Sequence, residues 1–248
     1  MKTWQKLLIS TLIVVLIAGT YLFFVFQARK DPGVAARQPE AEKPMTDDQL
    51  AYVKAYYFAT FDQAKQIEGR NVWIKAGYSL PYYPYAGNTV QFSKRVGVLP
   101  AAEKLAVSKL IKAVAPAKED DRVPHGTRQY FAVFTFAGPS ASENAKPGTF
   151  AAPIGYAEGD DEKLWTDQLF FYDDPKTIYA HWPKPVWDAI TAHTPTVGMS
   201  ENQVRMAVGM KMDSDSTSIG DRTVTYDTGD KKWTVTFVKN AATAVKAG

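Results

Sequence analysis

The sequence predicts an α+β protein, with an N-terminal transmembrane helix, a mainly antiparallel β domain and a small α+β domain. Three observations support this class. Leu7–Phe26 is a run of twenty uncharged residues. From residue 71 onward, short runs rich in β-branched and aromatic residues alternate with Gly, Pro and Asn turns. After residue 196, a capped helix precedes two alternating strands that a short turn joins.

The composition of the chain argues against a nucleic-acid partner and excludes chemistry that needs cysteine. The chain has 248 residues, a formal charge of +3 and no cysteine. Lys and Arg are scattered among Asp and Glu without a run of five like charges, which argues against a nucleic-acid partner. Without cysteine there is no disulfide framework, no thiolate metal site, no cysteine nucleophile and no lipid-modified N-terminal cysteine.

Residues 1–27 are predicted to form an uncleaved transmembrane signal anchor. Twenty helical residues span roughly 30 Å, the thickness of a bilayer core. The run is too long for a cleavable signal peptide, which is the alternative. We expect residues 7–26 to contact the inner (cytoplasmic) membrane as a single pass, with the soluble part on the periplasmic or extracytoplasmic side. Lys2 and Lys6 nearly balance Arg29 and Lys30, so a cytoplasm-facing soluble part stays open as an alternative.

Residues 28–45 are predicted to be a flexible linker, because Pro and Gly interrupt a stretch without apolar periodicity. Residues 46–68 are predicted to be an amphipathic helix. Thr46 and Gln49 fit a capping box, Leu50, Val53, Tyr57 and Phe61 recur at helical spacing, and Gly69 follows as a stop.

Residues 69–157 are predicted to form a β domain. Its order is NVWIKAGYSLPYYPY, then VGVLPAAEKLAV, then strands ending in APIG. This order resembles a bacterial SH3-like barrel, a family whose members commonly bind peptides or cell-wall fragments. The resemblance implies a ligand groove at the Pro-containing turn. Tyr78, Tyr82, Tyr83 and Tyr85 are its candidate ligand-binding residues, together with Trp182 further along, because aromatic rings provide stacking surfaces. The alternative is that these tyrosines cover the end of their own domain.

Residues 158–196 are predicted to be an aromatic and acidic connecting segment with short helices. A Ca²⁺ site does not fit the spacing of its acids, and its histidines lack the H-E-x-x-H spacing of a zinc site. Asp173, Asp174 and His181 are alternative catalytic candidates, because paired carboxylates can hydrolyse glycosidic bonds. The simpler interpretation is that these acids cap turns and helix starts.

Residues 197–240 are predicted to form a small α+β domain. Val197-Gly-Met-Ser-Glu-Asn-Gln-Val204 opens a helix with Ser200 at the N-cap, and strands over 222–227 and 231–239 follow. The block resembles the SmpA/OmlA (BamE-like) domain of envelope lipoproteins. The family's lipid-bearing cysteine is absent here. The first strand lacks the tryptophan of the family's W-x-Y motif but contains its tyrosine, Tyr226. The resemblance implies an envelope setting and no catalytic residue. Residues 241–248 are predicted to be a disordered tail.

No phosphate-binding loop, dinucleotide-binding glycine pattern or G-x-S-x-G motif is present. We therefore predict no catalytic residue, no cofactor and no metal. The expected function is a membrane-anchored envelope protein with a binding or scaffolding ectodomain, whose partner is an envelope protein or a cell-wall component. The alternative is a membrane-tethered hydrolase of cell-wall or glycan material that uses carboxylates in 158–174.

Overall fold

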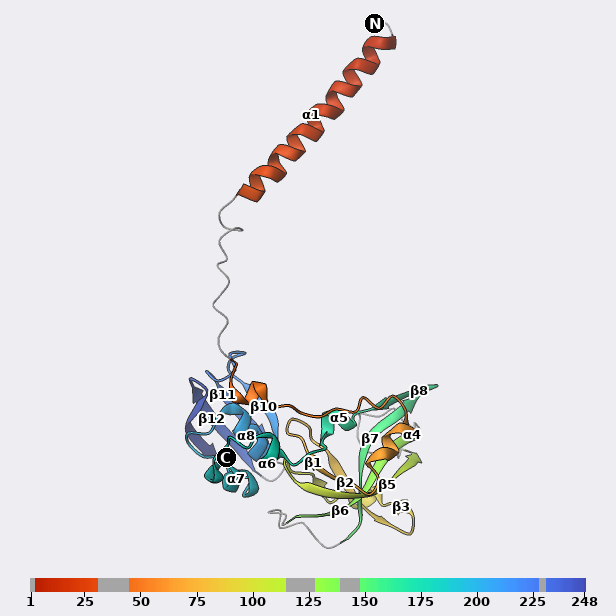
Figure 1. Cartoon of the computed structure of the whole chain (residues 1–248), viewed down its shortest axis with the longest axis vertical. Helices are drawn as coiled ribbons and strands as arrows, with labels where there is room; N and C mark the ends of the chain where they lie inside the picture. The colour runs from red at the N-terminus through yellow and green to blue at the C-terminus, as the bar shows by residue number, and fades with distance from the viewer. Residues whose placement is uncertain (1–2, 31–44, 115–127, 139–147, 228–230) are drawn as a thin grey trace. The chain divides into compact units, whose positions relative to one another are not determined.

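The computed structural model describes residues 3–30, 45–114, 128–138, 148–227 and 231–248. The chain divides into two compact units, Met1–Thr46 and Asp47–Gly248. The second unit contains two separate β-sheets, which form its two lobes (Figure 1). The structure is mixed α and β with mainly antiparallel sheets, which confirms the predicted α+β class.

The first unit contains helix α1, Thr3–Lys30, so a helix is present where residues 7–26 predict one. The side chains at 3, 5–10, 13 and 28–30 are not among those described. Within the described part of the chain, no helix is long and apolar enough to cross a membrane. The transmembrane role predicted for residues 1–27 is therefore not confirmed. The linker predicted over 28–45 lies largely outside the described residues.

The first lobe is a nine-stranded sheet with the order β3-β2-β7-β6-β5-β1-β9, in which β4 also pairs with β2 and β8 with β7. All of these pairs are antiparallel. The strands are β1 Asn71–Ile74, β2 Pro81–Ala86, β3 Thr89–Val90, β4 Gly97–Val98, β5 Lys104–Val114, β6 Arg128–Phe136, β7 Phe150–Glu158, β8 Asp161–Leu164 and β9 Phe170–Phe171. Short helices η2 Phe92–Lys94 and α5 Thr166–Leu169 lie between them. Helix α6 Pro175–Ile178 follows β9, and its Ile178 packs against the core of the second lobe.

Strand β6 is buried on both faces, because apolar residues follow one another along it rather than alternating with polar ones. Tyr130 and Phe134 join the main core of the lobe. Phe131 and Val133 join a smaller cluster that contains Tyr83. The sheet is thus covered on both sides in its centre, which fixes its register.

Strands β8 and β9 extend the first sheet beyond the boundary predicted at residue 157. Gly155 on β7 permits the pairing with β8, since a Cβ there would lie 2.2 Å from the carbonyl oxygen of Lys163. Trp73 and Ile74 of β1 pair with β9 at the opposite end of the sheet. The segment predicted only to connect two domains therefore contributes two strands to the first of them.

The second lobe is a four-stranded sheet, β10-β11-β12-β13, with two helices. Its elements are α7 Lys184–Thr191, α8 Glu201–Val208, β10 Met210–Ser214, β11 Thr223–Asp227, β12 Lys232–Val238 and β13 Ala241–Ala247. The predicted N-cap at Ser200 is confirmed, and Ser200 and Gln203 form a capping box in which each side chain accepts from the other's backbone N–H at the start of α8. The tail predicted to be disordered is instead strand β13, which pairs with β12 along its length.

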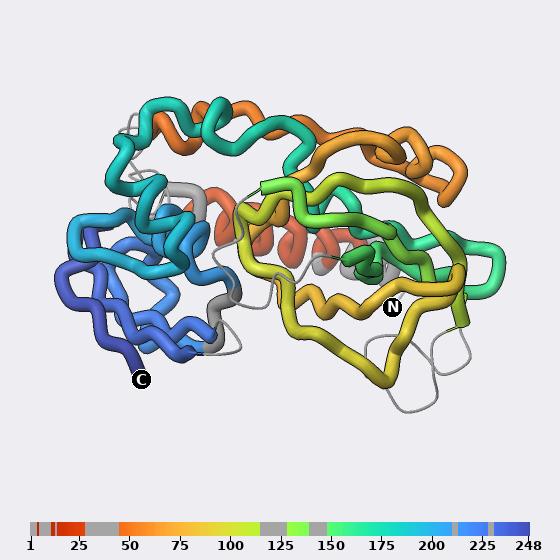
Figure 2. Tube along the Cα trace, turned by 90° about the horizontal axis from the view of Figure 1, so that it is seen from below, coloured from red at the N-terminus to blue at the C-terminus, as the bar shows by residue number. Residues whose placement is uncertain are grey.

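The amphipathic helix predicted over 46–68 is wrong. Helix α3 covers Asp47–Leu50, α4 covers Phe61–Ala64 and the 3₁₀ helix η1 covers Lys65–Ile67. Residues 51–59 between them carry no regular structure. We call residues 47–61 the strap, because this segment runs beside residues of both lobes (Figure 2).

Carboxylates far away in sequence take the backbone N–H groups that a helix would have used. Asp167 accepts from Tyr56 N at 3.0 Å and from Tyr57 N at 2.7 Å. Glu162 accepts from Phe61 N at 2.5 Å. Tyr57 has a left-handed φ of 52°, which turns the chain out of a helical path. These long-range bonds outweigh the local helical pattern.

The beginning of the strap is bound to the second lobe. Asp48 accepts from Trp182 Nε1 and lies 2.6 Å from His181 Nε2, both at its Oδ1. Its Oδ2 accepts from Asn202 Nδ2 at 3.1 Å. Since Asp167 and Glu162 hold the later part of the strap on the first lobe, this one segment connects the two lobes.

An ion pair is buried in the second lobe. Glu201 and Arg222 have side chains that are 4% and 9% exposed. Glu201 also accepts from Gly220 N at 2.9 Å. Burial by itself would raise the pKa of Glu201, but the hydrogen bonds from Arg222 and Gly220 hold it below its usual range.

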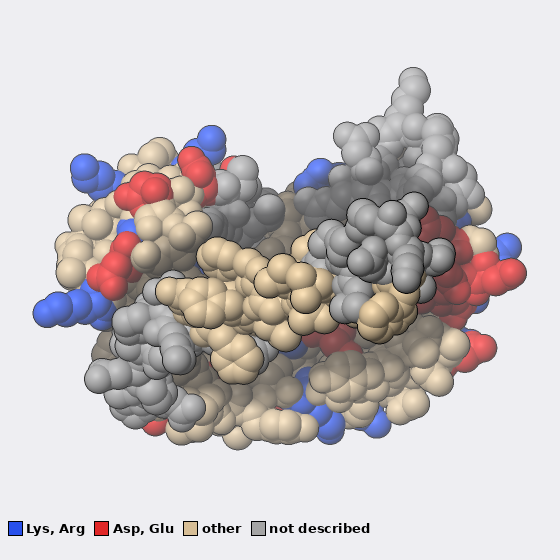
Figure 3. Space-filling view, turned by 90° about the horizontal axis from the view of Figure 1, so that it is seen from above, with Lys and Arg blue, Asp and Glu red and all other residues tan. Residues whose placement is uncertain are grey.

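On the face of the molecule seen in Figure 3, Lys and Arg side chains lie among Asp and Glu side chains.

We predict that Asp167→Asn destabilises the protein by about 1.5–3 kcal/mol, the net contribution of a hydrogen bond to a charged group. A carboxamide accepts through one oxygen, so it cannot serve Tyr56 N and Tyr57 N together. Denaturant unfolding measures the change. Asp62→Asn is the matched control, because Asp62 is an exposed carboxylate close to the strap that pairs with Lys65. Equal unfolding midpoints for the two variants would contradict the assigned role of Asp167.

We predict that Glu201→Gln lowers stability at pH 7 by roughly 3–5 kcal/mol, because it leaves Arg222 buried without its charge partner. The folded-state pKa of Glu201 is depressed, so its contribution is present above the unfolded pKa and is lost as pH falls through the folded pKa. The variant should therefore lose less stability on acidification than the parent. Parallel pH profiles in thermal unfolding would be inconsistent with this account.

Candidate functional site

A cavity of about 180 Å³ lies between the two lobes. One wall comes from β1, the start of β5 and the turn before it. The other comes from α6, α7 and the residue at 193 that follows α7. The side chains that matter for its chemistry are Trp73, Glu103, Lys104, Asp174, Lys176, Trp187, Thr191 and His193. We call this the inter-lobe cavity.

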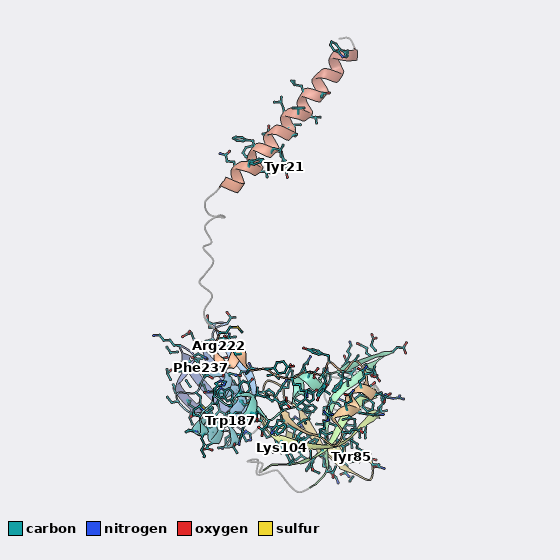
Figure 4. The ribbon with its side chains drawn as sticks, in the orientation of Figure 1. Tyr21, Tyr85, Lys104, Trp187, Arg222 and Phe237 are labelled. Carbon is teal, nitrogen blue, oxygen red and sulfur yellow. The ribbon has the colours of Figure 1, made fainter. Side chains whose placement is uncertain are left out.

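Two lysine–tryptophan pairs line the inter-lobe cavity. Lys104 Nζ lies 5.2 Å from the centroid of the Trp73 ring, and Lys176 Nζ lies 6.0 Å from that of Trp187. These are cation–π distances. Figure 4 labels Lys104 and Trp187, one from each wall. Each wall therefore presents an aromatic surface with an ammonium group beside it.

Local structure explains where these groups sit. Trp73 and Lys104 are paired residues of β1 and β5, so the sheet register places them opposite each other. Asp174 caps α6 by accepting from Lys176 N at 2.8 Å, which fixes the first turn that carries Lys176. Trp187 packs on Trp182 with ring centroids 5.3 Å apart.

His193 lines the cavity just after α7, with a left-handed φ of 49°. Its Nδ1 lies 3.1 Å from the carbonyl oxygen of Ala207. A carbonyl only accepts, so this bond places a proton on Nδ1. Burial lowers the pKa of His193, with the bond to Ala207 opposing it. The imidazole is therefore neutral at pH 7, and Nε2 is a hydrogen-bond acceptor.

The tyrosines predicted to bind a ligand do not form one groove. Tyr82 is buried in the main core of the first lobe, while Tyr83 is buried in the cluster on the other face of the sheet. Tyr78 is 43% exposed. Tyr85 donates to Asn88 and lines a second, more open hollow that also contains Lys109. This hollow belongs to the first lobe alone.

Trp182 and the alternative catalytic candidates do not come together either. Trp182 is buried and stacks on Tyr179 with centroids 4.3 Å apart. His181 pairs with Asp48, and Asp174 lines the inter-lobe cavity while capping α6. No hydrogen bond or ion pair joins Asp173, Asp174 and His181 in the described residues. Among these residues there is also no cluster of three or more His, Cys, Asp or Glu that could hold a metal.

Sequence reasoning missed Trp73, Lys104, Lys176 and His193 as members of a site. The Trp73–Lys104 pair depends on strand register, which the two short runs do not specify by themselves. Lys176 follows Asp174, one of the acids that the sequence predicts to cap turns or helix starts. The bond from His193 to a carbonyl of α8 leaves no local signal in the sequence.

Comparison with family models, with curated proteins and with solved structures finds no match to this chain. The resemblances of residues 69–157 and 197–240 to known families therefore stay predictions.

We predict that His193→Asn removes a pH dependence of stability. Because the folded pKa of His193 is depressed, the unfolded state binds the proton more tightly. Stability from this group is present above the ordinary histidine pKa of about 6.5 and is lost as pH falls below it. Asparagine does not titrate there and tolerates the left-handed backbone. Between pH 7 and pH 5 the parent's thermal midpoint should fall further than the variant's; equal falls would refute the assignment.

Proposed function

We propose that this chain is a membrane-tethered envelope protein whose second unit binds a cell-wall component in the inter-lobe cavity, without catalysing a reaction. The uncharged run of residues 7–26 supports the tether, and we place the second unit on the extracytoplasmic side of the inner membrane. In the same proposal, residues 69–157 are SH3-like and residues 197–240 are BamE-like. Both families occur as binding or assembly modules.

The observation that carries this proposal is the make-up of the inter-lobe cavity. It is concave, its walls are largely aromatic and apolar, and a few polar groups lie among them, which is the usual make-up of a ligand site. Its walls come from both lobes, and sites at such junctions are common.

The roles of the acidic residues favour binding over hydrolysis. Glu162 and Asp167 accept backbone N–H groups of the strap, and Asp174 accepts one in α6. Glu162 also accepts from Tyr130, whose pKa is raised to about 12, first by burial and then by this bond. Tyr130, Phe61 N and Lys112 hold the pKa of Glu162 below its usual range, the opposite of a general acid's requirement.

The test uses the full chain, purified in detergent micelles and mixed with insoluble cell-wall polymer. We predict that the parent protein sediments with the polymer and releases no soluble fragments. Thr191→Trp should weaken this retention about tenfold, because the indole occupies the cavity that exposed Thr191 lines. Thr194→Trp is the matched control, an exposed threonine three residues later that does not line the cavity.

Release of soluble fragments would show a hydrolase and overturn the proposal. Equal retention of the parent and Thr191→Trp would show that the inter-lobe cavity is not the binding site.

A further inference from the structure

We propose that the inter-lobe cavity binds one carboxylate-bearing sugar ring, whose acid group lies with Lys104 and Lys176. This inference rests on the proposed function, because it names the chemistry of the ligand for the same cavity. Three features of the cavity carry it: its charge, its size and its hydrogen-bond acceptors.

Two ammonium groups and two carboxylates line the cavity, and the two ammonium groups are the ones that a ligand can pair with. In the described residues, neither Lys104 nor Lys176 forms an ion pair with a carboxylate. Of the two acids in the lining, Glu103 is buried at 6% exposure and Asp174 accepts from the backbone of α6. Both ammonium groups are therefore available to an anion, and charge-assisted hydrogen bonds to a carboxylate are the strong ones.

The size and walls of the cavity suit a single ring. At about 180 Å³ it is smaller than the roughly 300–1,000 Å³ of pockets that bury drug-sized ligands. Half-buried Trp73 provides a flat aromatic surface, and the buried side chains of Trp187, Pro175 and Ile190 close the cavity with apolar atoms. A polymer chain would enter this space with one terminal or side residue.

Two further side chains, His193 and Thr191, offer acceptors that hydroxyl groups of a ligand can satisfy. His193 is neutral and its Nδ1 proton is used by Ala207, so Nε2 accepts. Thr191 Oγ1 donates to the carbonyl of Trp187 at 2.8 Å and keeps its lone pairs. A ligand with one acid group and several hydroxyls matches two cations and two acceptors. That combination describes an acidic sugar.

The experiment titrates the full chain in detergent micelles at pH 7 with D-glucuronate and, separately, with D-glucose. Tryptophan fluorescence reports binding, because Trp73 and Trp187 are two of the six tryptophans and line the cavity. We expect glucuronate to bind about tenfold more tightly than glucose, the gain of one charge-assisted pair.

Lys104→Gln and Lys176→Gln test the two cations. Each should reduce glucuronate affinity about tenfold and glucose affinity by clearly less, because only the acid forms a charge-assisted pair. Lys163→Gln is the matched control, because Lys163 also lies over an aromatic ring, at 5.7 Å from Tyr156, but does not line the cavity. It should change neither affinity.

Equal affinities for the acid and the neutral sugar, or a glucuronate affinity unchanged in both cavity variants, would overturn the acidic-sugar assignment. If retention on cell-wall polymer still depends on residue 191 in that case, the proposed function stands and only the ligand chemistry is wrong. If neither sugar binds and Thr191→Trp also retains the polymer normally, both proposals fail.

Discussion

The hydrogen bonds that carboxylates form between the strap and the two lobes are the constraint on which the arrangement of the second unit depends. Asp48 takes three side-chain donors from the second lobe, and Asp167 takes two backbone N–H groups of the strap on the first lobe. Asp167 is itself well supported: Tyr172 donates to its carboxylate, and Lys75 Nζ donates to its carbonyl at 2.6 Å. Lys75 is partly buried, and this burial lowers its pKa. The segment that directly follows the predicted linker therefore connects both lobes.

This connection matters for function because the inter-lobe cavity takes one wall from each lobe. A shift of either wall would separate the Trp73–Lys104 pair from the Trp187–Lys176 pair. The strap is also bound next to the cavity. Trp182 donates to Asp48 and packs on Trp187, which lines the cavity. A ligand that contacts both walls would bind the connected form more tightly than a separated one, so binding and strap attachment should support each other.

The sequence predicts most strongly where local rules decide. Alternation in 222–227 and 231–239 matches β11 and β12, and Ser200 is the N-cap as predicted. The helical pattern of 46–68 failed because Asp167 and Glu162, about 100 residues later, take the N–H groups of that segment. The cavity could not be predicted from the sequence for the same reason. Strand register brings Trp73 to Lys104, and the packing of the two lobes places Trp187 in the same cavity. Tyr82 and Tyr83 show a further limit, since neighbours on a strand point to opposite faces.

Hydrogen–deuterium exchange of the full chain, with and without soluble cell-wall fragments, shows where the ligand binds without the use of a mutation. We predict that fragments slow exchange at both walls together, in 72–74 and 102–106 of the first lobe and in 187–194 of the second. Slowed exchange confined to one wall, or centred on the hollow at 85–92 and 109–114, would contradict a ligand site held between the lobes.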